Sequence, residues 1–173
     1  ASVPDIMEKI NDMLNENNEL SGKRVLVTAG PTRERLDPIR YLSNFSSGKM
    51  GYSIADSFTR RGAEVILVSG PTNLPVPAGV KRIDVESTAE MFEAVKEHMT
   101  ADIGIFTAAV SDFTVKEQSG QKIKKQKDSV PSIELVETQD ILKYVGHNNE
   151  DMYVVGFAAE TENVEAYALG KLE

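Results

Sequence analysis

The sequence predicts an α/β fold built on a mostly parallel, doubly wound sheet. Short apolar runs, each followed by glycine, proline or other small residues, recur along the chain. Amphipathic helical patterns lie between these runs, and this alternation is typical of a parallel sheet with helices on both faces. Ligands of such sheets bind at the carboxyl ends of the strands, so the segments after each strand are the first candidates for a site.

Composition limits the class of protein. The chain has 173 residues, of which 40% are hydrophobic and 27% charged, as expected for one globular domain. No apolar run approaches the roughly 20 residues that span a bilayer, so no membrane partner is expected. A net charge of −8 argues against nucleic acid as a partner, because phosphate backbones require a basic face. The absence of cysteine excludes disulfides and thiolate metal sites and suits a reducing, cytoplasmic location.

Residues 1–22 are expected to form an N-terminal helix and linker ahead of a main domain at residues 23–173. Four apolar residues share one helical stripe: Ile6, Ile10, Met13 and Leu14. Ser21-Gly22 then ends the segment. The segment is either a free N-terminal arm or the remnant of a junction to another domain, and we favour the junction. The last helical pattern ends at Glu173 without a cap, which predicts a domain truncated at its C-terminus.

The first half of the main domain contains two clear strands. Val25–Thr28 is a short apolar run closed by Ala29-Gly30-Pro31, which indicates a buried strand that ends in a tight turn. A helix is predicted at about Met50–Arg61, with Gly62 at its end. Val65–Val68 is the second buried strand.

A third strand and a capped helix follow. Val80–Val85 alternates in polarity as a half-buried strand does. Ser87 and Glu90 have the spacing of a capping box, and Met91 begins the inward-facing residues of the helix that it opens. Ile103–Phe106 is the fourth strand and continues into small residues.

The remaining elements are shorter. Ser132–Glu137 alternates and is expected to be an edge strand or hairpin arm. A short helix is predicted at about Asp140–Val145, another buried strand at Tyr153–Phe157 and a last helix from about Asn163. The whole pattern predicts a Rossmann-like sheet with a lysine-bearing hairpin or flap.

The first candidate site is the helix entrance Ser43–Gly51. Its small residues allow a phosphate to approach free backbone N–H groups, and the helix dipole favours negative charge there. The segment is not a Walker A loop, because Ser43 and Met50 stand where that motif requires glycine and a hydroxyl residue. No G-x-G-x-x-G follows the first strand either. The alternative is a glycine-rich helix start with an exposed lysine.

Two loops at strand ends are further candidates. Gly30–Arg40 is longer than the two to six residues usual for a strand-to-helix connection, and its arginines, Arg33 and Arg40, are either an anion clamp or solvated surface charge. Ala108–Phe113 leaves room for a flat ligand after the fourth strand. Its Asp112 is placed to hold a base, a ribose or a hydrated metal, or else to cap a helix.

The second half of the chain adds a basic cluster and an aromatic strand end. Lys122–Lys127 holds four lysines in six residues, which are either a solvated face or a partner for a triphosphate. Phe157, followed by the small residues Ala158 and Ala159, is placed either beside a nucleobase or in the core. His98 and His147 have no partner in the sequence and are assigned no chemistry.

Taken in this order, the segments closely resemble phosphopantothenoylcysteine synthetase, the ligase of the coenzyme A pathway that bacteria often fuse behind a flavin-dependent decarboxylase. The resemblance extends from Val25 to about Lys171. The matching pieces are VLVTAGPTRERLDPIRYLSNFSSGKMGYSIA, VILVSGP, AAVSDF, KIKK, QDIL and VVGFAAET.

The resemblance implies a two-step ligation. The carboxylate of 4'-phosphopantothenate attacks CTP to give an acyl-cytidylate and pyrophosphate, and the amine of L-cysteine then displaces CMP. Mg²⁺ assists, and CTP rather than ATP is the nucleotide of most bacterial members. The resemblance also implies a homodimer, a native chain fused to the decarboxylase, and no flavin in this fragment.

The resemblance assigns roles to individual positions. Asn44 stabilises the acyl-nucleotide intermediate, and Lys122 is the second catalytic residue. The nucleotide-binding positions are Gly30, Asp112, Lys122, Gln139, Asp140, Ile141, Leu142, Phe157 and Lys171. The positions for the phosphate of phosphopantothenate are Arg40, Ser46, Ser47, Gly48, Lys49, Met50 and Gly51, although the helix entrance suits a nucleotide phosphate equally well. No metal ligand is assigned.

One departure from the family pattern affects these roles. Thr138-Gln139 stands where related sequences often have Asn-Pro, so side-chain contacts to cytosine are in question while main-chain contacts are retained. Two other functions stay open on the residues alone: an NAD(P)-dependent Rossmann-like reductase, and a nucleotide-binding module without catalysis.

Overall fold

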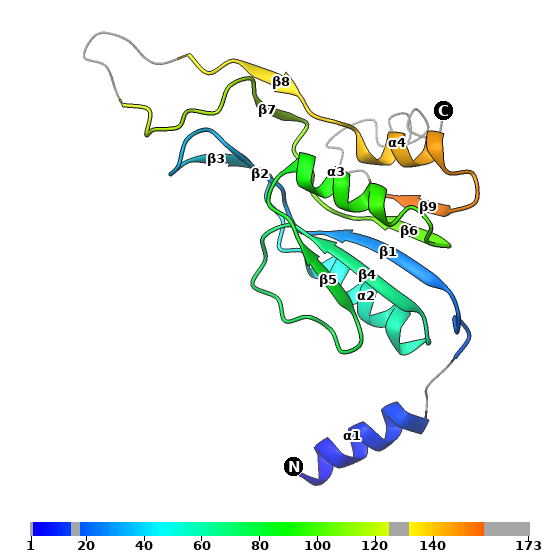
Figure 1. Ribbon diagram of the computed structural model, residues 1–173. Helices are drawn as coiled ribbons and strands as arrows, with labels where there is room; N and C mark the ends of the chain where they lie inside the picture. Colours follow the sequence, from blue (N-terminus) through cyan, green and yellow to red (C-terminus); the bar gives the residue numbers. More distant parts are fainter. Residues whose placement is uncertain (1, 15–17, 125–131, 158–173) are drawn as a thin grey trace, which may run out of the picture.

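The computed structural model describes residues 2–14, 18–124 and 132–157, and its centre is a five-stranded parallel sheet (Figure 1). The strands are β1 (Arg24–Ala29), β4 (Glu64–Ser69), β5 (Lys81–Asp84), β6 (Ile103–Phe106) and β9 (Tyr153–Gly156). They lie in the order β5-β4-β1-β6-β9. The chain therefore winds outward from β1 in one direction and then from β6 in the other. In such sheets the crevice between the two halves is the usual ligand site.

Helices cover both faces of the sheet, as the alternation of strands and helices predicts. Helix α2 (Lys49–Arg60) packs on one face, and α3 (Thr88–Glu97) and α4 (Ile141–Asn148) pack on the other (Figure 1). Neighbouring residues of β1 serve different faces, since Val25 joins the cluster under α2 and Leu26 the cluster under α3. Both faces of β1 are buried, which is why its sequence is an unbroken apolar run.

Two small antiparallel hairpins stand at the carboxyl end of the sheet. One pairs β2 (Arg33–Arg35) with β3 (Tyr41–Ser43), and the other pairs β7 (Phe113–Val115) with β8 (Leu135–Glu137). The second confirms the prediction of a hairpin arm at Ser132–Glu137.

The first hairpin corrects the expectation that Gly30–Arg40 is an open loop. The side chain of Asp37 accepts hydrogen bonds from the backbone N–H groups of Ile39 and Arg40 at 2.8 and 2.9 Å. An aspartate that bonds the backbone two or three residues on, followed here by Pro38, makes a tight turn. This turn lets the chain fold back on itself.

The prediction that Tyr153–Phe157 is a buried strand is wrong in its burial. Strand β9 pairs with β6 and is the last strand of the sheet within the described residues. Tyr153 is 72% exposed and Phe157 48%, while Val154 and Val155 are only partly buried. A strand at the side of a sheet has neighbours on one side only. The helix predicted from Asn163 lies outside the described residues.

The N-terminal helix α1 (Val3–Leu14) confirms the helix expected in the first 22 residues. It stands apart from the sheet in Figure 1. The described apolar side chains of its stripe are solvent-exposed, with Ile6 at 47% and Ile10 at 42%. None of the helices in the described part of the chain is long and apolar enough to cross a membrane.

Candidate active site at the carboxyl ends of β1 and β6

The segments after β1 and β6 run side by side beyond the end of the sheet. The N–H of Ala109 donates to the carbonyl oxygen of Gly30 at 2.8 Å, and Pro31 and Ala109 form an isolated parallel bridge. These two segments lie where the winding of the sheet reverses, the place at which such sheets bind ligands in a crevice, and we name them the crevice floor. The site predicted from the strand ends therefore has a continuous backbone base.

Glycine allows α2 to begin directly against this floor. A Cβ atom on Gly51 would lie 2.5 Å from Cβ of Ala29 and 2.6 Å from Oγ1 of Thr107. Gly48 has a φ of +74°, and a Cβ atom there would lie 3.3 Å from the backbone nitrogen of Gly30. The structure thus brings together Gly30, Gly48 and Gly51, which the sequence assigned to nucleotide or phosphate binding.

The start of α2 is open to an anion. Gly48 is its N-cap and provides no side-chain hydrogen bond, and no acidic residue lies in the first turn. The hydroxyls of Ser46 and Ser47 accept from the N–H groups of Gly48 and Lys49 only at 3.3 and 3.5 Å. The partial positive charge of the helix end is therefore hardly neutralised, and small residues surround it, as phosphate binding requires.

Helix α3 shows the opposite arrangement. The side chain of Ser87 accepts a hydrogen bond from the N–H of Glu90 at 3.2 Å, which confirms the predicted cap. The carboxylate of Glu90 accepts from the N–H of Glu86 at 2.6 Å. The first turn of α3 is satisfied by the protein itself, which distinguishes it from the start of α2.

Asn44 reaches the floor of the crevice through the first hairpin. The hydroxyl of Ser43, at the end of β3, donates to the carbonyl oxygen of Thr32 at 2.7 Å. The side-chain amide of Asn44 donates to the carbonyl oxygen of Val110 at 2.8 Å. A side-chain amide carries two N–H donors and one acceptor oxygen, and Asn44 is exposed, so one donor is available to a ligand.

The segment before α4 is attached to the same loop. The N–H of Thr138 donates to the carbonyl oxygen of Asp112 at 3.0 Å. The hydroxyl of Thr138 donates to the carbonyl oxygen of Ser111 at 2.6 Å. The exposed side chain of Gln139 follows directly. The structure therefore brings the loop at Asp112 and the segment from Gln139 together through Thr138, a link that the sequence does not indicate.

Three residues assigned to the nucleotide also have structural roles. The carboxylate of Asp140 caps α4 by accepting from the N–H of Lys143 at 2.9 Å. Ile141 is buried at 5% exposure, and Leu142 is partly buried and packs against Gly156. The side chains of Ile141 and Leu142 are occupied by packing, so only their backbone groups would be free to contact a base, while Oδ2 of the exposed Asp140 stays outside the cap bond.

Arg40 is engaged by an acidic neighbour. Its guanidinium pairs with the carboxylate of Asp37, whose side chain is fully buried, and donates to the carbonyl oxygen of Ile123 at 2.7 Å. The N–H of Ile123 donates back to Asp37 at 3.0 Å. The Arg40 guanidinium holds the pKa of Asp37 well below its usual value. In the structure this pair clamps the backbone of the β7–β8 arm.

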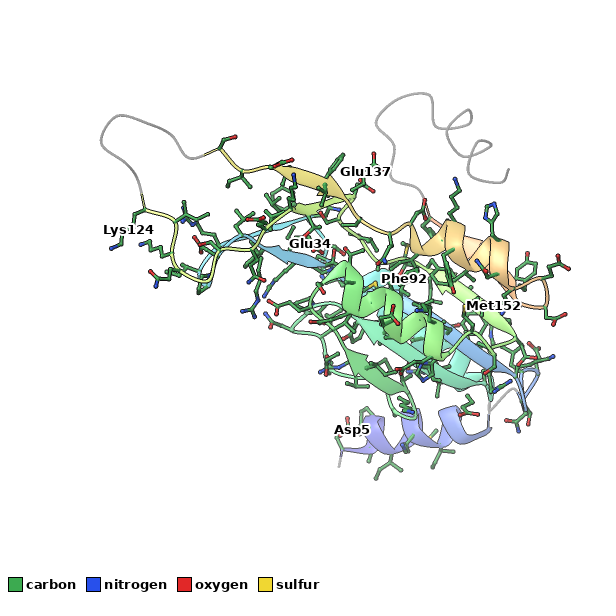
Figure 2. All side chains as sticks on the ribbon, turned by 45° about the horizontal axis from the view of Figure 1, so that its top comes forward. Asp5, Glu34, Phe92, Lys124, Glu137 and Met152 are labelled. Atoms are coloured by element: carbon green, nitrogen blue, oxygen red, sulfur yellow. The ribbon has the colours of Figure 1, made fainter. Side chains whose placement is uncertain are left out.

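Arg33, Lys122 and Lys124 lie on the two hairpins. The guanidinium of Arg33 stacks on the ring of Tyr41 at 4.7 Å. Lys122 is exposed in the loop between β7 and β8, and Lys124 lies on the outer part of that arm (Figure 2). The structure does not bring Lys122 into contact with Asn44. Phe157 follows β9, and its N–H donates to the carbonyl oxygen of Phe106 at 3.3 Å. Lys171 lies outside the described residues.

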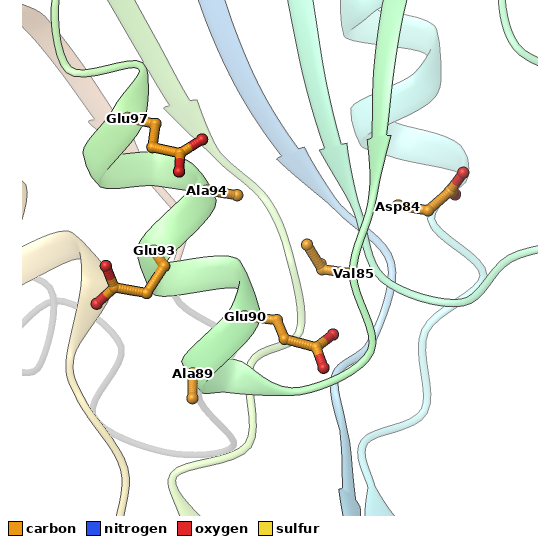
Figure 3. A pocket seen from close by; sticks show the side chains of 7 residues that line it. All are labelled: Asp84, Val85, Ala89, Glu90, Glu93, Ala94 and Glu97. Atoms are coloured by element: carbon orange, nitrogen blue, oxygen red, sulfur yellow. The ribbon is translucent and has the colours of Figure 1, made fainter.

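A shallow hollow beside α3 does not suit a phosphate ligand (Figure 3). It is lined by Asp84, Val85, Ala89, Glu90, Glu93, Ala94 and Glu97. The carboxylates among these side chains would repel a nucleotide. Within residues 2–14, 18–124 and 132–157, no three histidine, aspartate or glutamate side chains gather as a metal site would require.

Comparison with known proteins gives one consistent family. The profile described as "DNA/pantothenate metabolism flavoprotein C-terminal domain" matches residues 20–173. The chain is 48% identical, over 171 residues, to the coenzyme A biosynthesis bifunctional protein CoaBC of Haemophilus influenzae, covering 98% of this chain and 42% of that one. It is 50% identical over 155 residues to the CoaBC of Bacillus subtilis, covering 88% and 38%. The chain spans about two fifths of the length of these relatives.

Solved structures agree on the fold. The crystal structure of the C-terminal domain of CoaBC is 51% identical with a TM-score of 0.78, over 90% of this chain and 74% of that one. A Cab2 variant in complex with phosphopantothenate-cysteine has a TM-score of 0.72 over 99% of this chain and 77% of that one. At 18% identity, this second likeness shows the fold alone.

Proposed function

Since the chain belongs to the family described as DNA/pantothenate metabolism flavoprotein C-terminal domain, we propose that it is the phosphopantothenate–cysteine ligase of coenzyme A biosynthesis. One observation carries the proposal. The uncapped start of α2, the amide of Asn44 and the loop that ends at Asp112 converge at the carboxyl ends of β1 and β6. An anion-binding helix end beside an oriented neutral donor suits a reaction that joins a carboxylate to a nucleotide phosphate.

The proposed reaction has two steps. A carboxylate oxygen of 4'-phosphopantothenate attacks the α-phosphorus of CTP, and the bond from that phosphorus to the bridging oxygen breaks to release pyrophosphate. The amine of L-cysteine then attacks the acyl carbon of the acyl-cytidylate. The carbon–oxygen bond breaks, CMP leaves and the amine loses a proton. Activation is needed because a free carboxylate has no good leaving group.

Asn44 is proposed to bind the acyl oxygen of the intermediate. Its bond to Val110 fixes the side chain before a ligand arrives, so its second N–H is already oriented. Preorganised donors of this kind stabilise the charge that develops in acyl transfer. The start of α2 is proposed to hold the phosphate of phosphopantothenate, and Lys122 to meet the phosphates of CTP.

The described residues fit a magnesium ion that is held mainly by the phosphates of the nucleotide. They contain no group of three acidic or histidine side chains placed to hold the ion, and Mg²⁺ is commonly held by one or two carboxylates together with substrate phosphates. Asp112, with its exposed side chain at the strand ends, is the carboxylate proposed to contact it. The ion would neutralise phosphate charge during both steps.

The proposal extends to assembly. Residues 23–173 are proposed as the ligase domain and residues 1–22 as its link to a flavin-dependent decarboxylase in a longer native chain. A homodimer is also proposed. Its support is a set of exposed apolar side chains on the β7–β8 arm, namely Phe113, Ile133, Leu135 and Val136.

The function is tested by product formation from defined substrates. We expect the purified protein to release pyrophosphate from CTP only when phosphopantothenate is present, and to release CMP and turn over repeatedly only when L-cysteine is present as well. ATP replaces CTP in one control reaction, and NADPH binding is measured in another to test the reductase alternative. No pyrophosphate release in the complete mixture would reject the ligase. Pyrophosphate release without amide formation would reject the second step.

A further inference from the structure

A buried chain of hydrogen bonds runs beneath the site and ends at a carboxylate. The N–H of Ser111 donates to Oγ1 of Thr32 at 2.9 Å, and the hydroxyls of Thr32 and Thr88 lie 3.0 Å apart. The hydroxyl of Thr88 donates to Oε1 of Glu34 at 2.8 Å. All four residues are buried, with Glu34 only 5% exposed.

The carboxylate fixes the direction of every bond in this chain. Oε1 of Glu34 accepts from both the hydroxyl and the N–H of Thr88, each at 2.8 Å. A hydroxyl has one proton, so Thr88 can only accept from Thr32. Thr32 then has no proton left, and its oxygen accepts the N–H of Ser111. A weaker contact, 3.4 Å from Thr88 Oγ1 to the Ser111 carbonyl oxygen, competes for the same proton.

The hydrogen-bond chain ends in the loop that carries the proposed chemistry. Val110 accepts the hydrogen bond from Asn44, and Asp112 follows Ser111 directly. The carbonyl oxygen of Ser111 also accepts a hydrogen bond from the hydroxyl of Thr138 at 2.6 Å. A shift of this loop would move the donor for the acyl oxygen and the segment before α4 together.

We propose that Glu34 is a positioning residue that holds the loop Val110–Asp112 through Thr88 and Thr32. The inference rests on the proposed ligase for its effect on turnover. Glu34 touches no substrate in this scheme. It acts by keeping the N–H of Ser111 bonded and the loop in one place, because reacting groups displaced by about 1 Å can lose up to roughly 10²-fold in rate.

A second role of Glu34 must be separated from this one. Thr88 is the first residue of α3, so the carboxylate also caps that helix, where negative charge is favoured. Thr32 belongs to the hydrogen-bond chain but not to the cap. Ser87 belongs to the cap but not to the chain. Variants at these two positions therefore distinguish loop positioning from helix capping.

The test compares Thr32→Val, Thr32→Ser and Ser87→Ala. Thr32→Val keeps the side-chain shape and removes the hydroxyl, so kcat should fall roughly 10- to 100-fold. The KM for phosphopantothenate should stay within about twofold of the parent value, since the start of α2 is not part of the hydrogen-bond chain. Thr32→Ser should retain activity. Ser87→Ala should lower the melting temperature with kcat unchanged. A Thr32→Val enzyme with normal kcat would overturn the inference.

Hydrogen exchange decides the inference without reference to the ligase. The amide of Ser111 should exchange faster in Thr32→Val than in the parent protein, Thr32→Ser or Ser87→Ala. Equal protection of Ser111 in all four proteins would overturn loop positioning. A parent protein that makes no pyrophosphate, yet shows this exchange pattern, would reject the proposed function and support the positioning of the loop.

Discussion

The side-chain amide of Asn44 donates a hydrogen bond to the carbonyl oxygen of Val110 across 2.8 Å. This bond links the end of the β2–β3 hairpin to the loop after β6. It uses one of the two N–H groups of the amide and leaves the other for a ligand. The geometry explains why an amide, rather than a carboxylate of the same size, suits this position.

Asn44→Asp is expected to lose most of the ligase activity. A carboxylate cannot donate to the Val110 carbonyl and would add negative charge beside an acyl-phosphate. Removal of a preorganised donor typically costs roughly 10²- to 10³-fold in kcat. Steady-state measurement of pyrophosphate and amide formation checks this.

Asn148→Asp is the matched control. Its side-chain amide also donates to a backbone carbonyl oxygen, that of Tyr144, at 2.8 Å. Asn148 is the last residue of α4, at the opposite end of the helix from Asp140. We expect kcat to remain that of the parent protein. Equal activity in the Asn44 and Asn148 variants would contradict the role of Asn44.

Gly51→Ala should displace the start of α2. The new Cβ atom would meet Ala29 at 2.5 Å and Thr107 at 2.6 Å, so the helix must move from the floor of the crevice. Overpacking of this kind costs about 1–3 kcal/mol of stability. We also expect a higher KM for phosphopantothenate.

Gly146→Ala controls for the change of residue type. Gly146 lies within α4, and a Cβ atom there meets nothing within 4 Å. Alanine is favoured over glycine in a helix by roughly 1 kcal/mol, so this variant should be as stable as the parent or more stable. Urea denaturation and substrate titrations of the two variants measure the difference. Similar destabilisation by both substitutions would count against close packing at Gly51.

Thr138→Val tests the link between the two halves of the nucleotide site. Valine keeps the branched shape but loses the hydroxyl that donates to Ser111 at 2.6 Å. We expect the KM for CTP to rise several-fold, because a net hydrogen bond contributes about 1 kcal/mol. Thr138→Ser restores the donor and should restore the KM. An unchanged KM in the valine variant would show that the bond does not position the nucleotide.

The acid limb of stability should depend on Asp37. Arg40 first, with the backbone donors of Ile39 and Ile123, holds the pKa of this carboxyl below its unfolded value of about 3.9. A lowered folded pKa contributes stability that is fully present above the unfolded pKa and is lost as the pH falls through the folded one. The difference in unfolding free energy between the parent and Asp37→Asn should therefore shrink as the pH falls from about 4 to about 2. A constant difference in unfolding free energy over this range would contradict the ion pair.

The regular elements could be predicted because their signals are local. The apolar runs of β1, β4 and β6 and the capping box of α3 are patterns among close neighbours, and each lies within two residues of its predicted place. Burial of β9 was predicted wrongly, because an apolar run does not reveal whether a strand lies at the centre or the side of a sheet. The β2–β3 hairpin was missed because its strands are only three residues long.

The sequence by itself determined the order of strands and helices and, through it, the edge of the sheet at which ligands are expected. Periodic hydrophobicity is a property of neighbouring residues, so it survives without the fold. Only the tertiary structure decided which loops meet. Asn44 and Val110 are 66 residues apart, Thr32 and Ser111 are 79 apart, and Asp37 and Ile123 are 86 apart. In the sequence, Glu34 between two arginines has the pattern of surface charge, and packing of β2 against the start of α3 makes it a buried acceptor instead.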